Sequence, residues 1–517
     1  MAGRAGTGVR MNLDHVPVRE SGMTPYEIML SESQERMLIV AHKGQERQVV
    51  DIFKNWDLDA VVIGRVTDTS RVQLVCHEGT VADIPVGYLT DEAPLYERPM
   101  RAPKRRDAGE ASEDKDVAVG GGIDIVSPAP PTAPVFDDDE QRTQTSDDGR
   151  RTTDNGLRDH ADSLRLLLAS PNVASKEWAY RQYDHMVRTN TAVLPGADAA
   201  VVRIKETRRA LAMCLDGNGR YCAADPREGA KLVVAEAARN VVCVGARPLA
   251  VTNCLNFASP ERPEVMWAFS EVIDGMAEAC LAFDTPVISG NVSFYNETEG
   301  RGILPTPVIG MVGLIEEVSR IVQPGFKAEG DTVVLLGETR DDLSISEYAA
   351  TVEGRTTDEM IARGRVPALS LELEKRVQEA CLRLAAEGLL RSAHDCSDGG
   401  LAVAVAESCF STLNRPSVGV DLALCSGTLP VATYLFAESP SRIVVSFDPE
   451  AGDRVHEIAE ELNCPVTLLG TVGGERLAVK VNGAEEIDAG VNELEQVWRG
   501  SLSSRLRAEA SAASSAD

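Results

Sequence analysis

A repeat within the chain constrains its fold more than any other sequence feature. The segment FAESPSRIVVS (436–446) repeats LSESQERMLIV (30–40) at a constant offset of 406 residues. The same offset carries Gly64 onto Gly470 with no gap in between. Convergent strand chemistry imitates one such match, but it does not hold register over some 30 residues. The sequence therefore predicts that the two segments are copies of one structural unit.

The sequence around each copy extends the repeat and exposes a difference. The flanking matches are VRMNL (9–13) with VGVDL (418–422), and RVQLVCHEG (71–79) with RLAVKVNG (476–483). Some 240 residues of ordered-looking sequence precede the late copy, including HDCSDGG (394–400), whereas only a few residues precede the early copy. By the spacing of the late copy, the early counterpart of HDCSDGG falls just before Met1. We therefore expect a two-unit protein whose first unit lacks its front half.

Helical and strand patterns alternate along the chain, which indicates an α/β (α+β) protein. The predicted strands are 36–40, 60–64, 199–204, 211–215 and 307–312, and the predicted helices are 45–55, 175–183, 229–244 and 264–282. In the third helix, apolar residues recur at steps of three and four and so share one face: Ala230, Val233, Val234, Ala237, Ala238 and Val241. The segment from about Arg101 to Asp162 is rich in Pro, Gly and charge without a periodic apolar face. This composition predicts a disordered acidic linker.

Composition excludes several classes of partner. The formal net charge is −28, so the chain repels phosphate backbones, and we expect no nucleic acid and no membrane as partners. The eleven cysteines form no Cys-x-x-Cys pair, which is typical of reduced thiols in a cytoplasmic protein. No apolar run approaches 18 residues, and the N-terminus lacks the apolar core of a signal peptide.

The stretch PVISGNVSFYN (286–296) places a small polar triplet, Ser289-Gly290-Asn291, between two β-prone runs. One interpretation is a turn, because Gly-Asn is common hairpin chemistry. The other is a site where the backbone comes close to a phosphate or a metal ion, since glycine has no side chain to collide with a ligand. The stretch alone leaves both interpretations open.

Six motifs together closely resemble the large, synthetase subunit of phosphoribosylformylglycinamidine synthase. They are SGMTPYEIMLSESQERM, SPNVASKEW, QYDHMV, ARPLAVTNCLNF, PVISGNVSFYN and HDCSDGGLAVAVAE, in the family's order. The resemblance implies an ATP-dependent C–N ligase of purine biosynthesis. Such an enzyme converts formylglycinamide ribonucleotide to formylglycinamidine ribonucleotide, with ATP and Mg²⁺ as cofactors. It also implies two partners: a glutaminase subunit that supplies ammonia and a small accessory subunit.

The resemblance further implies tandem repeats of the aminoimidazole-ribotide-synthetase type, the first lacking its front half. The implied domains are 1–95, the back half of the first repeat; 96–168, the acidic linker with a short helix; 169–315, the front half of the second repeat; 325–482, its back half; and 483–517, a C-terminal tail.

Site residues follow from the resemblance, position by position. Substrate binding is implied for Glu32, Ser33, Gln34 and Ser293, ATP binding for Asn253 and Gly290, and a Mg²⁺ contact for Asn291. Many family members carry Asp where this chain has Asn253, so this contact loses a charge.

Other interpretations stand beside these roles. Glu32 is also explained by a pair with Arg36, because both residues recur in the late copy as Glu438 and Arg442. Gln34, by contrast, becomes Pro440, which favours a site role for Gln34.

Two histidines are tempting but weaker candidates. His394 lies between acidic residues in the second unit, whose equivalent site in this family is degenerate or structural. His185 is better explained as an orienting or packing residue than as a base.

The family's general-base histidine, its ATP-binding Tyr and Lys, and several Mg²⁺ carboxylates belong to the first front half, so no catalytic residue is assigned to this chain. General acid–base help and charge neutralisation each contribute orders of magnitude in rate. We therefore expect the chain to be inactive or nearly so alone. The rival hypotheses are a synthetase- or kinase-like relative acting on another small molecule, and a non-catalytic scaffold or regulatory chain that keeps the fold.

Overall fold

The structure, a computed structural model, describes residues 1–18, 20–32, 36–103, 159–412 and 415–514. Contacts between residues divide the chain into two compact units, Met1–Glu97 and Arg98–Asp517. Most of the predicted linker, 104–158, lies outside the described residues.

The first unit contains a four-stranded sheet in the order β2-β1-β3-β4. Strand β1 pairs antiparallel with β2 and parallel with β3, and β3 pairs antiparallel with β4. The elements are α1 (Ala2–Ala5), β1 (Gly8–Asn12), η1 (Leu13–His15), α2 (Pro25–Leu30), α3 (Glu46–Lys54), β2 (Gly64–Thr67), β3 (Arg71–Cys76), β4 (Gly79–Pro85) and η2 (Val86–Leu89). The fully buried core cluster of this unit is small and consists of Leu13, Leu74 and Cys76.

Two predicted strands of the first unit differ from the structure. The segment 36–40 forms no strand, and its apolar side chains from Met37 to Val40 are 49–83% exposed. The segment 60–64 contributes only Gly64, at the start of β2. The predicted helix 45–55 is confirmed as α3. Apolar, β-branched sequence favours a strand, but a strand forms only where another strand supplies its hydrogen bonds.

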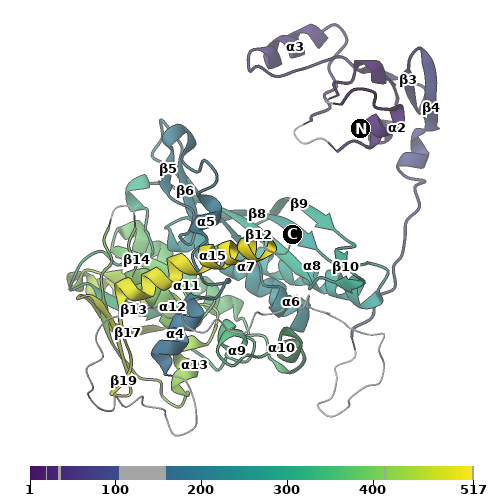
Figure 1. Cartoon of the computed structure of the whole chain (residues 1–517). Coiled ribbons are helices and arrows are strands. Elements are labelled where there is room, and N and C mark those ends of the chain that lie inside the picture. The colour runs from purple at the N-terminus through teal and green to yellow at the C-terminus, as the bar shows by residue number, and fades with distance from the viewer. Residues whose placement is uncertain (19, 33–35, 104–158, 413–414, 515–517) are drawn as a thin grey trace, which may run out of the picture. The chain divides into compact units, whose positions relative to one another are not determined.

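The front of the second unit is a six-stranded sheet in the order β5-β6-β7-β12-β8-β9. Its elements are α4 (His160–Leu168), α5 (Glu177–Tyr180), η3 (Val187–Thr189), β5 (Thr191–Val193), β6 (Ala200–Arg203), β7 (Ala210–Asp216), α6 (Gly219–Ala224), α7 (Pro226–Cys243), β8 (Arg247–Asn256), α8 (Pro263–Phe283), β9 (Val287–Ser293), β10 (Glu297–Thr298), β11 (Arg301–Gly302), β12 (Thr306–Ile315) and η4 (Val318–Arg320). Helices α7 and α8 pack side by side against this sheet (Figure 1).

Helix α7 has the apolar face that the sequence predicts. Asp225 caps its N-terminus by accepting the N–H of Glu228, and Pro226 occupies the first turn, where no N–H is needed. All six predicted core residues of this helix are at most 1% exposed. Arg239, off that face, is also buried, because α7 lies between the front sheet and the back of the unit.

The back of the second unit is a seven-stranded sheet in the order β14-β16-β13-β17-β15-β18-β19. Its elements are β13 (Thr332–Leu336), α9 (Glu347–Thr351), α10 (Thr357–Arg363), α11 (Leu371–Glu387), β14 (Leu390–Asp395), α12 (Gly400–Cys409), β15 (Val420–Leu424), α13 (Val431–Phe436), β16 (Ile443–Phe447), η5 (Pro449–Ala451), α14 (Gly452–Glu461), β17 (Val466–Val472), β18 (Arg476–Val481), β19 (Ala484–Gly490) and α15 (Val491–Ser514).

The two copies of the repeat share one strand-pairing scheme. Strands β17-β15-β18-β19 pair with the same directions as β2-β1-β3-β4. Gly64 lies opposite Met11, and Gly470 lies opposite Leu422. A Cβ added to either glycine would lie 2.9 Å from the Cα of that partner residue. The duplication is therefore built into the sheet, and each glycine lets two strands approach closely.

This register corrects one detail of the sequence match. Met11 takes the place of Leu422, whereas the match of VRMNL with VGVDL puts Leu13 there. The loop that follows β1 is longer than the loop that follows β15, and short letter matches do not locate such a gap. Pairing through the glycine decides the register, because a slip of one residue turns every side chain to the other face.

Segment boundaries differ from the prediction at two further places. Helix α4 confirms the short helix predicted within 96–168, but it begins at His160, before the end of the acidic sequence near Asp162, because Leu164, Leu167 and Leu168 are fully buried. The predicted tail 483–517 begins instead with β19, which pairs with β18, and continues as α15.

One predicted helix is shorter in the structure: the segment 175–183 is helical only over Glu177–Tyr180.

All eleven cysteines are free thiols, and most are buried. Among the helices of the described residues, none is both long and apolar enough to cross a membrane.

Candidate functional site

Residues 287–293 form one continuous strand, β9, so the Ser289-Gly290-Asn291 triplet is not a hairpin turn. Strand β9 runs parallel to β8 at the edge of the front sheet. The pairing shifts register once, where Val251 pairs with Val287 and Thr252 pairs with Ser289, just before the polar triplet. The turn interpretation is therefore wrong, because β8 supplies hydrogen-bond partners that the local sequence does not reveal.

The β8–β9 pair carries four of the predicted site residues, two of them on each face of the sheet. Asn253 lies opposite Gly290, and three residues further along the strand Asn256 lies opposite Ser293. A Cβ added to Gly290 would collide with the side-chain oxygen of Asn253. The glycine is thus required by the neighbouring amide in the protein itself, which is a second reason for its presence besides close approach of a ligand.

The opposite face of the same strands carries a row of small polar groups. The hydroxyls of Thr252 and Ser289 lie 2.7 Å apart, and Asn291 Nδ2 donates to Ser293 Oγ at 3.1 Å. Because successive side chains of a strand point to opposite faces, Asn291 and Ser293 lie across the sheet from Gly290. Asn291 is exposed and Ser293 is half-buried, so both are accessible to a small molecule.

Mg²⁺ prefers about six oxygen ligands and keeps waters and phosphates among them. Asn291 offers one amide oxygen, so it fits a Mg²⁺ site only as one member of a set that nucleotide phosphates and other ligands complete. The other groups of the row serve hydrogen bonding, since the row consists of three hydroxyls and one amide.

In the first unit, Glu32 follows α2 and is exposed. Ser33 and Gln34 lie outside the described residues. The late copy shows which groups contact the equivalent carboxylate, that of Glu438. Glu438 accepts the backbone N–H groups of Glu347 and Gly399 at 2.7 and 2.9 Å, and its other oxygen accepts the hydroxyl of Tyr221 at 2.6 Å.

A pair between Glu438 and its neighbouring arginine does not form. Arg442 is fully buried and donates instead to the carbonyls of Ser439 and Ala437 at 2.8 and 2.6 Å. In the first unit, Arg36 likewise donates to the carbonyl of Ser31, the residue equivalent to Ala437. The arginine of the late copy therefore contacts backbone carbonyls rather than the acid, and Arg36 of the first unit also contacts a backbone carbonyl, so the site role of Glu32 stays a prediction.

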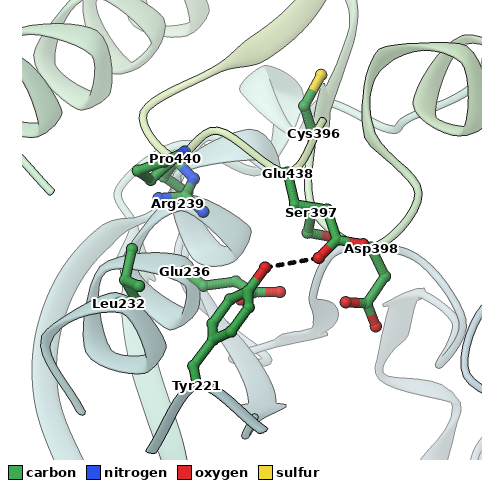
Figure 2. A pocket seen from close by; sticks show the side chains of 9 residues that line it. All are labelled: Tyr221, Leu232, Glu236, Arg239, Cys396, Ser397, Asp398, Glu438 and Pro440. Atoms are coloured by element: carbon green, nitrogen blue, oxygen red, sulfur yellow. Dashed lines mark hydrogen bonds between the residues drawn. The ribbon is translucent and has the colours of Figure 1, made fainter. Parts of the chain in front are cut away.

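Glu438 lies in a small pocket (Figure 2) lined by Tyr221, Leu232, Glu236, Arg239, Cys396, Ser397, Asp398, Glu438 and Pro440. Gly399 and Gly400 both have positive φ where the chain enters α12. The N-terminus of a helix attracts anions, and here the carboxylate of Glu438 occupies it. The protein thus supplies its own anion at this place.

The pocket concentrates acidic groups whose pKa values are raised. Burial, followed by repulsion from Asp398, raises the pKa of Glu438 to about 7, although Arg220 and the hydrogen bonds oppose this shift. Burial likewise raises the pKa of Asp398 to about 6. The sequence motif HDCSDGG pointed to Asp398, but Tyr221 and Glu236 come from helices distant in sequence and carried no local signal.

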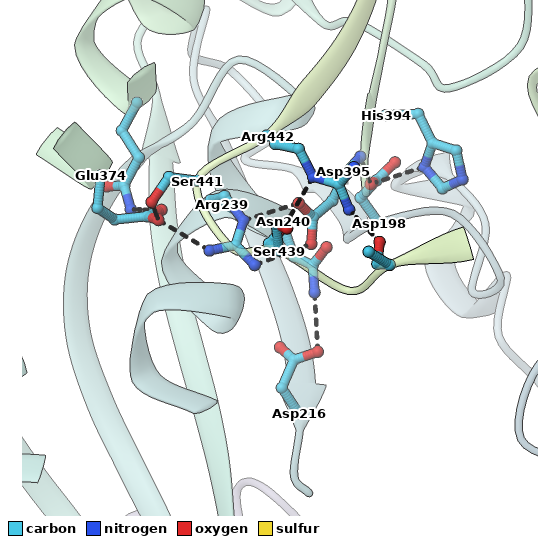
Figure 3. A network of polar contacts seen from close by, with 12 residues as sticks. Asp198, Asp216, Arg239, Asn240, Glu374, His394, Asp395, Ser439, Ser441 and Arg442 are labelled. Carbon is cyan, nitrogen blue, oxygen red and sulfur yellow. Dashed lines mark hydrogen bonds and ion pairs between the residues drawn. The ribbon is translucent and has the colours of Figure 1, made fainter. Parts of the chain in front are cut away.

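His394 does not line this pocket. Its Nδ1 contacts Asp198 at 2.9 Å and its Nε2 contacts Glu407 at 3.0 Å (Figure 3 shows the Asp198 side). Burial lowers the pKa of His394, but the two carboxylates outweigh burial and hold this pKa well above its ordinary value. The ring is therefore a cation clamped between two anions, which is a structural arrangement.

A second buried ion cluster joins α7 to the back of the unit (Figure 3). Arg239 donates to Asp395 at 2.7 Å and to Glu374 at 2.9 Å, and Ser441 also donates to Glu374.

His185 makes an edge-on contact with the ring of Tyr180 at 5.7 Å, in keeping with a packing role.

Comparison with known proteins gives this geometry a family. Residues 196–315 match the family described as AIR synthase related protein, N-terminal domain. Residues 1–77 and 328–482 match AIR synthase related protein, C-terminal domain. Together these matches span more than half of the chain. The chain belongs to the AIR synthase related proteins. The two C-terminal-domain matches coincide with the two copies of the repeat.

Within this family, the chain is similar to phosphoribosylformylglycinamidine synthase subunit PurL. It is 45% identical over 502 residues to PurL of Moorella thermoacetica, covering 97% of this chain and 62% of that protein. It is 46% identical over 527 residues to PurL of Anaeromyxobacter dehalogenans, covering 100% and 63%. The chain thus spans less than two thirds of the length of these relatives.

The solved structures support the fold. The structure titled T. maritima PurL complexed with ATP is 22% identical, with a TM-score of 0.57, and the match covers 92% of this chain and 61% of that one. The predicted tandem synthetase-like fold is therefore confirmed.

Proposed function

We propose that this chain is part of an ATP-dependent ligase that converts formylglycinamide ribonucleotide to formylglycinamidine ribonucleotide in purine biosynthesis. The observation that carries the proposal is the identity of 45–46% to PurL subunits over nearly the whole chain. Solved T. maritima PurL structures hold ATP in one case and FGAR in another, which supports both as ligands of this chain. Ammonia would come from a glutaminase subunit, with a small accessory subunit as a further partner and the cytoplasm as the place of action.

We assign residues of the β8–β9 pair to nucleotide and substrate. Asn253 and Gly290 are proposed to contact ATP, and Asn291 to provide one oxygen to Mg²⁺. Ser293 is proposed to bind the substrate through its hydroxyl, which Asn291 already orients. When bound, Mg²⁺ would neutralise phosphate charge. The protein groups themselves orient and hydrogen-bond, because the described part of the site offers no general base in the row of hydroxyls and amides.

In the first unit we assign Glu32, Ser33 and Gln34 to substrate binding. The carboxylate of Glu438 shows that this position suits hydrogen-bond donors converging on one acid. In the first unit a ribose hydroxyl or an amide of the substrate would take the place of those donors. Gln34, replaced by Pro440 in the late copy, would supply an amide that only the first copy offers.

The test is ADP release by the purified chain with formylglycinamide ribonucleotide, ATP, Mg²⁺ and high ammonium in place of the glutaminase. We expect little turnover from the chain alone and substrate-dependent turnover after a front half from a related PurL is added. Turnover by the chain alone would support the ligase and contradict the incomplete site.

No turnover in either case would favour the second candidate, a non-catalytic scaffold or regulatory chain. The exposed strand-like segment 37–40 is the specific observation that favours this candidate, since it offers a surface for assembly.

Variants make the complementation assay specific. Ser293→Ala should raise KM for the ribonucleotide, and Asn291→Ala should raise the Mg²⁺ requirement. Ser289→Ala is the matched control, because Ser289 lies on the same strand but bonds to Thr252. Gln34→Pro, which installs the residue of the late copy, should weaken substrate binding. Equal effects of Ser289→Ala and Ser293→Ala would contradict the assignment.

A further inference from the structure

Three potential metal ligands meet at one turn of the first unit. Asp14 follows β1 in η1, Cys76 is the last residue of β3, and His77 begins the turn into β4. Their ligand atoms all lie within 4.8 Å of one another. Cys76 Sγ is 3.3 Å from Asp14 Oδ1, and His77 Nδ1 is 3.1 Å from the same oxygen.

We propose that Asp14, Cys76 and His77 bind a divalent metal ion of the zinc type. Thiolate, imidazole and carboxylate are the three ligand types that Zn²⁺ takes in proteins. Mg²⁺ and Ca²⁺ fit poorly, because they need several oxygen ligands and only one residue here supplies oxygen. Three protein ligands leave a fourth tetrahedral position for water. On binding, the S–H bond of Cys76 breaks, its proton goes to solvent, and the sulfur electron pair forms the bond to the metal.

The late copy shows that the turn does not need these residues. The register that aligns Met11 with Leu422 places Cys425, Val481 and Asn482 where the first unit has Asp14, Cys76 and His77. The late turn is Asn482-Gly483, both with positive φ, which is the preferred chemistry of this hairpin.

The first unit makes the same turn with His77 and Glu78, also at positive φ. Such a backbone is costly for these two residues, and costly conformations persist where a residue serves another purpose. Asp14 accepts the N–H of His77, and Cys76 belongs to the core cluster of the unit, which explains a carboxylate and an apolar side chain at these places. That explanation accounts for neither the thiol nor the imidazole.

The size of the two cores supplies a reason for a metal in one copy and not the other. The first unit buries only three residues in its cluster, whereas the late copy rests on a large core. Small cores are commonly supplemented by a metal or a disulfide. An ion at this place would join the end of β1 to the β3–β4 hairpin. The His77 side chain is 91% exposed, so the ion reaches the site directly from solvent.

The test uses the full chain, stripped of metal with a chelator. Co²⁺ is added as a spectroscopic probe, and Zn²⁺ is then titrated calorimetrically. We expect one Co²⁺ per chain with a thiolate-to-cobalt absorption band, displaced by Zn²⁺. The band should vanish in Cys76→Ser, and His77→Asn should weaken Zn²⁺ binding at least about tenfold.

Controls separate the site from the other thiols and from misfolding. Cys425→Ser removes an exposed thiol of the late copy and should leave the band unchanged. His77→Asn installs the residue that the late copy uses at this turn, so the hairpin should still form. An absent band overturns the proposal, as does Zn²⁺ affinity that is equal in the original chain and both site variants. Because Asp14, Cys76 and His77 are not among the residues assigned to ATP and substrate, the result is independent of the ligase assay.

Discussion

The first unit and the back of the second unit pair the same four strands but differ in what lies beside them. In the second unit, β16 is fully buried between β13 and β14. The equivalent segment of the first unit, 37–41, forms no strand among the described residues, and its side chains from Met37 to Val40 are exposed. Copies of one sequence pattern therefore reach different structures, because burial of a strand depends on neighbours that lie far away along the chain.

The largest contrast is expected at the repeated arginine. Arg442→Ala removes a fully buried guanidinium and leaves the carbonyls of Ala437 and Ser439 without their donor, at a cost of about 3 kcal/mol or more. Arg36→Ala, at an exposed side chain, should change stability little. Hydrogen exchange with urea unfolding, read separately for each unit, measures both. Equal losses of stability would mean that Arg36 and Arg442 have similar surroundings, which would contradict the exposure of Arg36.

The next largest effect should be shared by both copies. Gly64→Ala and Gly470→Ala each force a Cβ to within 2.9 Å of a partner Cα, so each should cost about 1–3 kcal/mol in its own unit. Exchange protection in β1 and β15 is the measurement. Tolerance of alanine in only one copy would show that the register is held differently there.

A pH effect should belong to the late copy. The folded protein holds the proton of Glu438 with a pKa of about 7 against an ordinary value of 4.5. The stabilisation is therefore complete below about pH 4.5 and is lost as the pH rises through 7. Glu438→Gln should flatten the stability profile in this window, with Glu32→Gln as the matched control. Thermal unfolding across the window checks this, and an unchanged slope in Glu438→Gln would contradict the buried acid.

The smallest effect is expected at an exposed ion pair that both copies share. Arg71 contacts Asp83 at 2.5 Å across β3–β4, and Arg476 contacts Asp488 at 2.5 Å across β18–β19. Both pairs are exposed, and such pairs contribute little. Arg71→Ala and Arg476→Ala should each lower the unfolding midpoint slightly and to a similar degree. A large decrease of the unfolding midpoint in one unit would show that its ion pair is structurally essential.

Several elements could be predicted because their determinants are local. The apolar face of α7 and the helix α3 follow from periodicity, and the duplication follows from a constant offset that survives in the strand register. Asn253, Gly290, Asn291 and Ser293 do lie on one strand pair, although the triplet is part of a strand rather than a turn. Their roles remain predictions.

Other features depend on contacts between distant segments and could not be predicted. The exposure of Met37–Val40 reflects strands that do not pair there, and the turn held by Arg442 replaces the acid–base pair that sequence spacing favoured. Arg239 lies off the apolar face of α7 and is nevertheless buried, because its partners Glu374 and Asp395 come from 135 and 156 residues away.

The exposed run from Met37 to Val40 also affects how the polypeptide behaves in solution. Unpaired apolar strand segments are templates on which another chain adds a strand. Association of this kind grows with concentration, so we expect concentrated chains to associate through this segment and dilute chains to stay apart. A partner strand that paired with this segment would cover its apolar side chains and keep the chains apart. We therefore expect the solubility of the polypeptide to depend on its concentration and on the presence of such a partner.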